Sequence, residues 1–367
     1  MTVTAIVKII AISLIVGLSA CGGGGSGGDS SDGGSTRNSS PPQQQSSRPA
    51  ANVVNMTFGS NNTPTMTVTV CEPGTSNCAN IDNVEIDTGS VGLRLWQSAL
   101  PSSLNLPQEI YNGFALADCV TYVVGSGWGP MVTADVKISG ETAASVPVHV
   151  INNAYAGGSA TCNAYGVLPT LYNGILGIGN ELSDGDTLSV CTGNSCVRNQ
   201  DLTNSLKAAN PVVRFAHDNN GYILSFPNAS TSGTLTFGLG TETNNPVTGV
   251  RFIPGYSQQM LAASINGVRA SVMFDTGAPA NIVSSSLNIN GTANQTIQVG
   301  VPDDDTMPVT FNLQGANLAR SGDAIFHSPV LVLGMPYLFG HTRYLRLPQH
   351  SSSDFADQTA GGQIALQ

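Results

Sequence analysis

Charged and aromatic side chains are scarce in this chain. Of its 367 residues, 10% are Asp, Glu, Lys or Arg and 6% are Phe, Trp or Tyr. The 13 Lys and Arg stand against 23 Asp and Glu, which gives a net charge of −10, and the basic residues form no cluster. Proteins that bind nucleic acid neutralise phosphates with Lys and Arg. The composition therefore argues against a nucleic-acid partner.

Patterns that bind metal ions are missing as well. The five histidines are scattered and none belongs to an H-E-x-x-H sequence, which disfavours a metallopeptidase. The cysteines do not show the C-x2-C spacing of common zinc sites, and no pair of histidines accompanies them. The sequence therefore predicts no metal site.

The chain also lacks an apolar run long enough to cross a bilayer. Lys8 precedes an apolar segment, Ile9–Val16, that is too short for a membrane-spanning helix and is typical of a signal peptide, which we expect to cover residues 1–20. Leu18-Ser19-Ala20-Cys21 resembles the bacterial lipobox, in which the signal is cut before a cysteine that then carries lipid. The alternative is an ordinary cleavage site with an incidental cysteine.

The lipobox resemblance also implies a location. Gly22, rather than Asp, follows Cys21, and by resemblance this favours the outer membrane over the inner membrane. We therefore expect a protein of the bacterial cell envelope that is held to the membrane by lipid on Cys21 and faces the periplasm or the cell surface.

Residues 21–50 contain almost no apolar side chain and are rich in Gly and Ser. A segment of this composition cannot bury enough apolar surface to fold, so we expect a disordered tether. Residues 24–28 formally match the G-x-S-x-G pattern of serine hydrolases, but no strand precedes them and no helix follows, so we interpret them as part of the tether.

Six cysteines remain when Cys21 is set aside, and an even number in an exported chain favours disulfide bonds. Six thiols allow fifteen pairings. The short spacings favour Cys71 with Cys78 and Cys191 with Cys196, which leaves Cys119 with Cys162.

The rest of the chain favours an all-β fold. Gly, Pro, Ser, Thr and Asn separate short β-branched runs throughout, and the length suits two lobes of ordinary domain size.

A sequence repeat links the two halves. Apolar residues lead into Asp87-Thr88-Gly89 and again into Asp275-Thr276-Gly277, and an apolar stretch follows each triplet. Each triplet is followed later in the chain by two apolar residues and a glycine. In the first half this motif is "NGILGIG", from Asn173, with its glycine 90 residues after Asp87. In the second half it is "VLVLGMPYLFG", from Val330, with its glycine 59 residues after Asp275. The chain thus contains two related units that each place an Asp where a strand meets a turn.

This order of motifs resembles the pepsin-like aspartic peptidases, and the resemblance covers most of the chain after residue 60. It is similar also to a family of bacterial lipoproteins of uncharacterised function with the same architecture. The resemblance implies two β lobes, residues 51–228 and 229–367, related by a pseudo-twofold axis with a cleft between them, in a monomer. We expect only short helices, one near Asp201–Ala209.

The resemblance also implies a catalytic site. Asp87 and Asp275 would form the dyad, since two neighbouring carboxyls share a proton and can activate water, with no cofactor. The surrounding residues would support the dyad: Thr88 and Thr276 by hydrogen bonds between the lobes, Gly89 and Gly277 by close approach, and Ser90 by a hydrogen bond to Asp87.

Two features depart from the pepsin pattern or leave a choice. Ala278 stands where Ser90 has its counterpart, so Asp275 lacks a hydroxyl donor and should be less acidic than it would otherwise be. The segment from Cys119 to Gly140 is similar to the flap hairpin that covers substrate. Tyr122 occupies the position of the family's flap aromatic, but Trp128 lies nearer the Gly-rich stretch expected at the tip.

Two functions follow from these predictions. The first is a lipid-anchored aspartic endopeptidase that cuts polypeptides. The second is a non-catalytic envelope protein that uses the cleft to bind a peptide or protein partner.

Overall fold

The computed structural model describes residues 51–59, 61–157, 162, 166–185, 188–227, 232–256, 259–289, 293–300, 306–313, 316–319, 329–348 and 362–367. The described residues belong to one compact unit, Arg48–Gln367. The predicted signal peptide, the tether with Cys21, and the predicted lobe boundary at residue 228 lie outside the described residues.

The first half of the chain forms a closed β-barrel. Some of its strands, such as β2, contain both buried apolar residues and exposed polar ones. Others, such as β4, are buried along their whole length. The barrel closes because β7 pairs with both β8 and β2. In order around the barrel, its strands are β2 (Pro64–Cys71), β3 (Cys78–Asp87), β9 (Gly174–Ile178), β4 (Val91–Trp96), β8 (Glu141–Ile151) and β7 (Gly125–Ile138).

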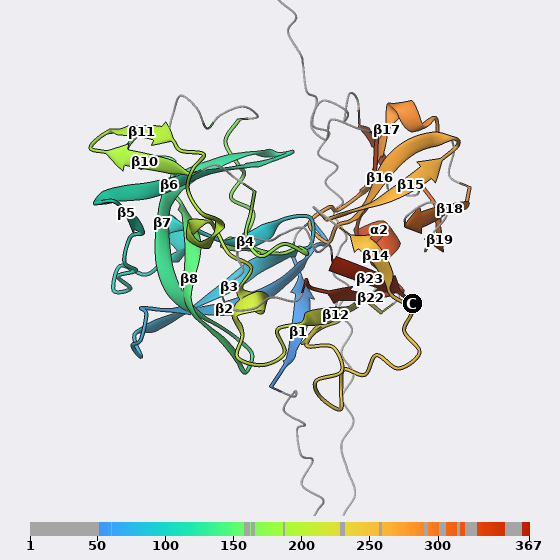
Figure 1. Ribbon diagram of the computed structural model, residues 1–367, viewed down its shortest axis with the longest axis horizontal. Helices are drawn as coiled ribbons and strands as arrows, with labels where there is room; N and C mark the ends of the chain where they lie inside the picture. The colour runs from blue at the N-terminus through green and yellow to red at the C-terminus, as the bar shows by residue number, and fades with distance from the viewer. Residues whose placement is uncertain are drawn as a thin grey trace, which may run out of the picture. The chain divides into compact units, whose positions relative to one another are not determined.

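A long hairpin extends from this barrel. β6 (Phe114–Tyr122) pairs with the first part of β7, and the two strands turn at Val123 and Val124. The outer edge of β6 carries β10 (Ser189–Thr192), which in turn carries β11 (Ser195–Arg198), and β5 (Ile110–Tyr111) also pairs with β6 (Figure 1). This hairpin is the segment that the sequence predicts to be the flap.

The second half of the chain forms an open sheet. In order across the sheet, its described strands are β19 (Thr306–Phe311), β18 (Gln295–Gly300), β15 (Met260–Ile265), β16 (Val268–Phe274), β21 (Val330–Leu333), β17 (Asn281–Ser284) and β20 (Ala316–Ala319). The fold is therefore all-β with two lobes, as the sequence predicts.

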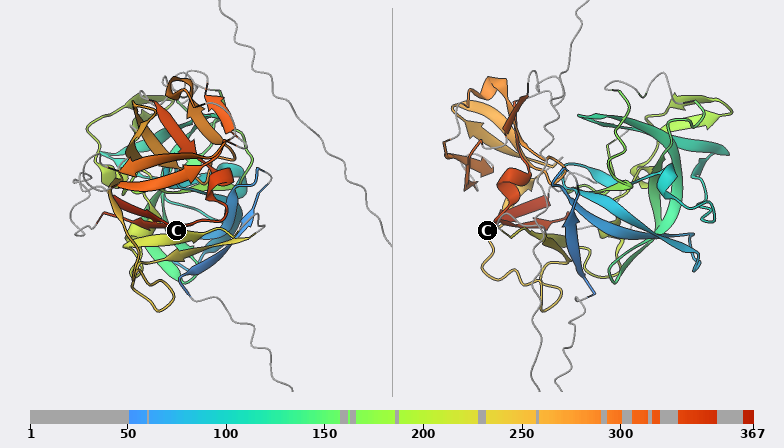
Figure 2. Two further views of the ribbon diagram at one scale, coloured as in Figure 1. Left: turned by 90° about the vertical axis from the view of Figure 1, so that its right-hand side faces the viewer. Right: turned by 180° about the vertical axis from the view of Figure 1, so that it is seen from behind.

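A third set of strands joins the beginning, middle and end of the chain. β1 pairs with β2 of the barrel and with β13, so it links the barrel to this set (Figure 2). In order, the strands are β1 (Val53–Phe58), β13 (Gly233–Phe237), β12 (Gly221–Ser225), β22 (Thr342–Arg346), β23 (Gly362–Leu366) and β14 (Ile253–Tyr256).

The two D-T-G triplets occupy equivalent places in the two lobes. β3 ends at Asp87 and pairs in parallel with β9, which also pairs antiparallel with β4. β16 ends just before Asp275 and pairs in parallel with β21, which also pairs antiparallel with β17. In each lobe the strand that carries the apolar-Gly motif thus lies between the two strands that flank the triplet.

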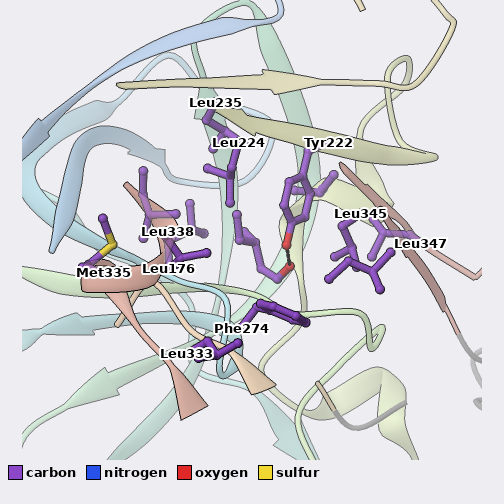
Figure 3. Packing of buried hydrophobic residues seen from close by; sticks show 14 of the residues in the cluster. Leu176, Tyr222, Leu224, Leu235, Phe274, Leu333, Met335, Leu338, Leu345 and Leu347 are labelled. Carbon is purple, nitrogen blue, oxygen red and sulfur yellow. Dashed lines mark hydrogen bonds between the residues drawn. The ribbon is translucent and has the colours of Figure 1, made fainter. Parts of the chain in front are cut away.

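One continuous core supports both triplets. Tyr222 is fully buried, and its hydroxyl donates to the carbonyl of Ile178, 2.6 Å away, at the end of β9 (Figure 3). Phe274, immediately before Asp275, packs in the same core as Leu333 and Leu345. The strands that end at the two aspartates therefore rest on shared apolar packing.

The predicted helix at Asp201–Ala209 is only a single 3-10 turn, Asn204–Leu206. Ala209 forms a bridge with Ser183 and donates its N–H to Pro147, so tertiary hydrogen bonds hold this part of the segment extended. Asn210 then caps a separate 3-10 turn, Pro211–Arg214. The remaining short helices are η1 (Gln97–Ala99), η4 (Ser285–Leu287) and α2 (Met335–Leu338).

The disulfide bonds pair as the spacings favour. Cysteines 71 and 78 close the β2–β3 hairpin, and cysteines 191 and 196 close the β10–β11 hairpin. The third bond joins Cys119 on β6 to Cys162. It ties the hairpin strand β6 to the chain that follows β8.

Candidate active site

The two D-T-G turns are held together by reciprocal hydrogen bonds. The backbone N–H of Thr88 donates to Oγ1 of Thr276 at 3.0 Å, and the N–H of Thr276 donates to Oγ1 of Thr88 at 3.1 Å. Each hydroxyl also donates to a strand of the other lobe, Thr88 to the Phe274 carbonyl at 2.8 Å and Thr276 to the Ile86 carbonyl at 2.6 Å. Both threonines are fully buried, so the two turns form one rigid junction.

The two carboxyls lie side by side above this junction. A Cβ atom at Gly89 would lie 2.6 Å from Cγ of Asp275, and one at Gly277 would lie 3.0 Å from Cγ of Asp87. No side chain fits in either position, so the glycines are required for each loop to approach the opposite acid. A Cβ atom at Gly277 would also lie 2.9 Å from Oδ1 of Asp87 and 3.2 Å from Oδ1 of Asp275, so the two carboxyls are close neighbours.

The donors to the two acids differ. Asp87 accepts hydrogen bonds from the Gly89 N–H at 2.7 Å and from the Ser90 hydroxyl at 2.5 Å. Asp275 accepts one from the Gly277 N–H at 2.8 Å, and Ala278 offers no hydroxyl. The two acids are thus chemically unequal, although the backbone around them is repeated.

The pKa of Asp275 lies well above its usual value. Burial is the largest cause, followed by the charge of Asp87 and by its hydrogen bond, whereas the Gly277 N–H acts in the opposite direction. The sequence predicts this direction from the missing hydroxyl alone, but desolvation contributes most. The raised pKa favours the protonated form of Asp275.

Two pockets flank the paired acids, and Tyr122 lines both of them. The first pocket has a volume of about 330 Å³ and includes Ser90, Arg94 and Asp184, whose guanidinium and carboxylate form a buried ion pair with a 2.6 Å contact. The second, about 190 Å³, contains both Asp87 and Asp275. We call the two pockets together the groove.

The two aromatic residues considered for the flap lie in different surroundings. Tyr122 is the last residue of β6, next to the Val123–Val124 turn. Trp128 pairs with Cys119 further along the hairpin and is buried against the Cys119–Cys162 disulfide, and it lines neither pocket.

The expectation that Trp128 lies nearer the tip is therefore corrected. The glycines around it lie within β7, where a Cβ atom at Gly129 would meet the Val150 carbonyl oxygen at 1.8 Å. They permit close strand packing and do not form the turn.

The smaller pocket also contains a third acid, which the sequence analysis missed. Glu85 lies two residues before Asp87 on β3, and residues so spaced on a strand face the same side. Its Oε1 accepts a hydrogen bond from the Thr63 hydroxyl at 2.8 Å, and the Tyr172 hydroxyl also bonds to it. The sequence offered one signal for Glu85: it is a charged residue that shares the side of Asp87 in an otherwise apolar strand end.

Burial raises the pKa of Glu85 to about 8, and the charge of Asp87 adds to this effect. Hydrogen bonds from Thr63 and Tyr172 oppose it but are weaker. Glu85 in turn raises the pKa of Asp275. The three carboxyls of the smaller pocket thus influence each other's protonation.

The described residues hold no group of three or more His, Cys, Asp and Glu placed to bind a metal ion. No helix among them has the length and apolar character needed to span a membrane.

Comparison with known protein families shows a match over much of the chain. A family described as "Protein of unknown function (DUF3443)" matches residues 48–287, well over half of the chain and a range that includes both aspartates. No curated protein matches the chain.

The threonine junction can be tested by replacing Thr88. Thr88→Val keeps the shape but leaves the buried N–H of Thr276 without its acceptor, which should lower the free energy of unfolding by about 1–3 kcal/mol. The Phe274 carbonyl keeps a donor, because Arg343 also bonds to it at 2.7 Å. Urea titration measures the change. Thr67→Val, at an exposed hydroxyl on β2, should cost less than about 0.5 kcal/mol, and equal losses would argue against the junction.

Glu85 should make the protein less stable as the pH rises. Its pKa is about 8 in the folded protein against 4.5 when exposed, so between these values the folded state holds a proton that the unfolded state has lost. This stabilising contribution is complete below about pH 4.5 and disappears as the pH passes 8, with an upper bound of about 5 kcal/mol.

The measurement is urea unfolding at pH 5 and at pH 8. Glu85→Gln should lose less stability across this interval than the native protein does, whereas Glu242→Gln, at an exposed position, should behave like the native protein. A native-like slope for Glu85→Gln would contradict the assignment.

Proposed function

The chain belongs to the DUF3443 family, whose function is unknown, and we propose that it is an aspartic endopeptidase that hydrolyses peptide bonds with Asp87 and Asp275. The observation that carries the proposal is the pair of neighbouring carboxyls that line one pocket, one of them with a raised pKa. Fold maintenance alone gives no reason to place two carboxyls side by side, because their mutual repulsion and desolvation are unfavourable.

The unequal surroundings of the two acids support different roles for them. Asp275 holds the proton, and Asp87, which accepts from Gly89 and Ser90, is the carboxylate. In the proposed reaction Asp87 takes a proton from a water molecule between the acids, and the water oxygen bonds to the carbonyl carbon of the peptide. Asp275 gives its proton to the carbonyl oxygen.

The tetrahedral species then breaks down. The proton on Asp87 passes to the amide nitrogen as the carbon–nitrogen bond breaks, and one hydroxyl of the tetrahedral carbon returns its proton to the dyad. The products are a carboxylic acid and an amine, and the dyad again holds one proton. The reaction consumes one water molecule and needs no cofactor.

The groove supports a polypeptide as substrate. Tyr122 lines two pockets of about 330 and 190 Å³, so the groove has room for more than one substrate side chain. Val123 and Val124 at the hairpin tip are exposed apolar residues and also line the smaller pocket. Closure of this tip over an extended peptide would exclude water from the bond that is cut.

The lipobox resemblance extends the proposal to location. Lipid on Cys21 would hold the protein to the bacterial envelope, at the outer membrane, and residues 21–50 would let the folded unit reach polypeptides near that surface. One chain supplies both acids, so the proposed enzyme acts as a monomer.

The proposal is tested by removing each acid without changing its shape. Asp87→Asn and Asp275→Asn should each lower the rate of cleavage of an unfolded polypeptide by about 10²–10⁴-fold, since each removes a general acid or base. Cleavage is followed between pH 3 and 7 by mass spectrometry, and circular dichroism confirms folding.

Asp135→Asn serves as the control, because Asp135 lies on the barrel strand β7 and bonds only to exposed backbone N–H groups. If the native protein cuts nothing and ignores transition-state-mimicking inhibitors, the groove serves to bind a peptide or protein partner without cleavage.

The lipid anchor is tested at Cys21. Cys21→Ser should abolish incorporation of a labelled fatty acid and move the protein out of the membrane fraction, since no thiol remains to be acylated. Ser26→Ala, within the tether, should change neither. Membrane retention and labelling of the Cys21 variant would contradict the proposed anchor.

A further inference from the structure

The described lining of the smaller pocket contains acids but no base. It includes Glu85, Asp87 and Asp275, and none of the described lining residues is Lys, Arg or His. The dyad accounts for two of these acids. Glu85 takes no part in the proposed proton transfers, so its presence needs a separate explanation.

A buried carboxyl is costly unless something offsets the loss of water. Glu85 is 8% exposed, and the groups that act on it are Asp87, Thr63 and Tyr172. Among the described residues, no cation is in that set. The fold thus keeps an acidic side chain at an unfavourable position beside the dyad. A ligand that enters this pocket would contact the Glu85 carboxyl.

The walls around Glu85 are largely apolar. Indole, phenol and aliphatic side chains face the pocket, among them Trp96, Leu168, Tyr172 and Ile175. The volume of about 190 Å³ exceeds that of a cavity known to hold benzene, about 150 Å³. One long side chain can therefore enter, with its carbon atoms against the walls.

We propose that this pocket receives a lysine side chain of the polypeptide substrate, with its methylene groups against Trp96 and Ile175 and its ammonium group on the Glu85 carboxylate. This inference rests on the proposed endopeptidase function and adds the substrate class to it. An apolar stem with a cationic end matches an apolar pocket with one acid. Lysine suits the site better than arginine, because the guanidinium carries five donors and the pocket offers few acceptors.

The position of Glu85 also places the lysine relative to the cut bond. Residues two apart on a strand have Cα atoms about 6.6 Å apart, so Glu85 lies about the length of one extended lysine side chain away from Asp87. The pocket therefore holds a side chain that is immediately next to the bond between the two aspartates. The net charge of −10 would in addition attract cationic polypeptides.

The lysine preference should depend on pH in a defined direction. Glu85 is neutral well below pH 8, and only its charged form makes an ion pair, so the preference should increase as the pH rises from 5 to 8. The other titratable groups that face Glu85 are Asp87, Asp275 and Tyr172. Burial raises the pKa of Tyr172 to about 12, so this hydroxyl does not titrate in the interval.

The experiment compares two otherwise identical peptides that carry either lysine or norleucine at one position next to the cut bond, with each side of the bond tested in turn. The full chain is purified in detergent, and kcat/KM is measured for the native protein, for Glu85→Gln, and for Glu141→Gln. Glu141 is an equally buried glutamate on β8, away from the groove, and is the matched control.

We expect the native protein and Glu141→Gln to prefer lysine over norleucine at one position. Glu85→Gln should reduce this preference by about 10- to 100-fold, the value of a hydrogen bond to a charged group. An apolar preference at both positions, or a preference that survives Glu85→Gln, would overturn the inference and leave the endopeptidase standing.

A binding measurement separates the two proposals. The affinities of the same peptides for Asp275→Asn are measured by fluorescence anisotropy, which needs no cleavage. Tighter binding of the lysine peptide, together with no cleavage by the native protein, would keep the lysine pocket and overturn the endopeptidase. Equal binding and no cleavage would overturn both.

Discussion

The reciprocal hydrogen bonds between Thr88 and Thr276 are the constraint on which the rest of the site depends. They join turns that are 188 residues apart in the sequence, and each threonine serves as donor and acceptor in a fully buried position. Because a buried N–H without an acceptor is costly, the two turns are stable together and not apart. The position of each carboxyl relative to the other follows from this junction, and so does the need for Gly89 and Gly277.

The packing beneath the junction explains how the protein tolerates acids at its centre. Phe274 and Ile86 precede the two aspartates and are fully buried, and their carbonyls accept from the threonines of the opposite lobe. Arg343, also fully buried, donates to the same Phe274 carbonyl, and its guanidinium lies over the Phe274 ring at 6.0 Å. Hydrogen bonds and apolar contacts from both lobes thus fix the strand ends, and the unfavourable desolvation of the carboxyls is confined to the groove.

The two lobes share a pattern but are not equal. Both place an apolar-Gly strand between the strands around a D-T-G turn. Among the described strands, only those of the first lobe close into a barrel, and that lobe extends the hairpin with Tyr122. Ser90 and Ala278 show the same inequality: the hydroxyl of Ser90 donates to Asp87, whereas Ala278 has no hydroxyl to donate to Asp275. Such differences separate the protonation of two acids that a symmetric site would leave alike, and this separation is what acid–base chemistry needs.

The sequence by itself determined the features that rest on local chemistry or on repetition. Each Asp-Thr-Gly follows an apolar run, so a strand end with a turn could be predicted at Asp87 and at Asp275, and their repetition predicted two lobes. The close spacing of two cysteine pairs favoured their disulfides. The helix at Asp201–Ala209 was wrong because bonds to Pro147 and Ser183, which no local pattern encodes, hold part of that segment extended.

The tertiary structure alone decided which side chains share the groove. Tyr122 and Trp128 lie on paired strands of one hairpin, and the turn at Val123 and Val124 decides which of them faces the acids. Glu85 appeared in the sequence as one more acid, and its significance depends on Thr63 and Tyr172, which come from distant parts of the chain. The alternation of side chains along a strand determines which residues share a face of the sheet. Which side chains of other strands they contact there is determined by the long-range register.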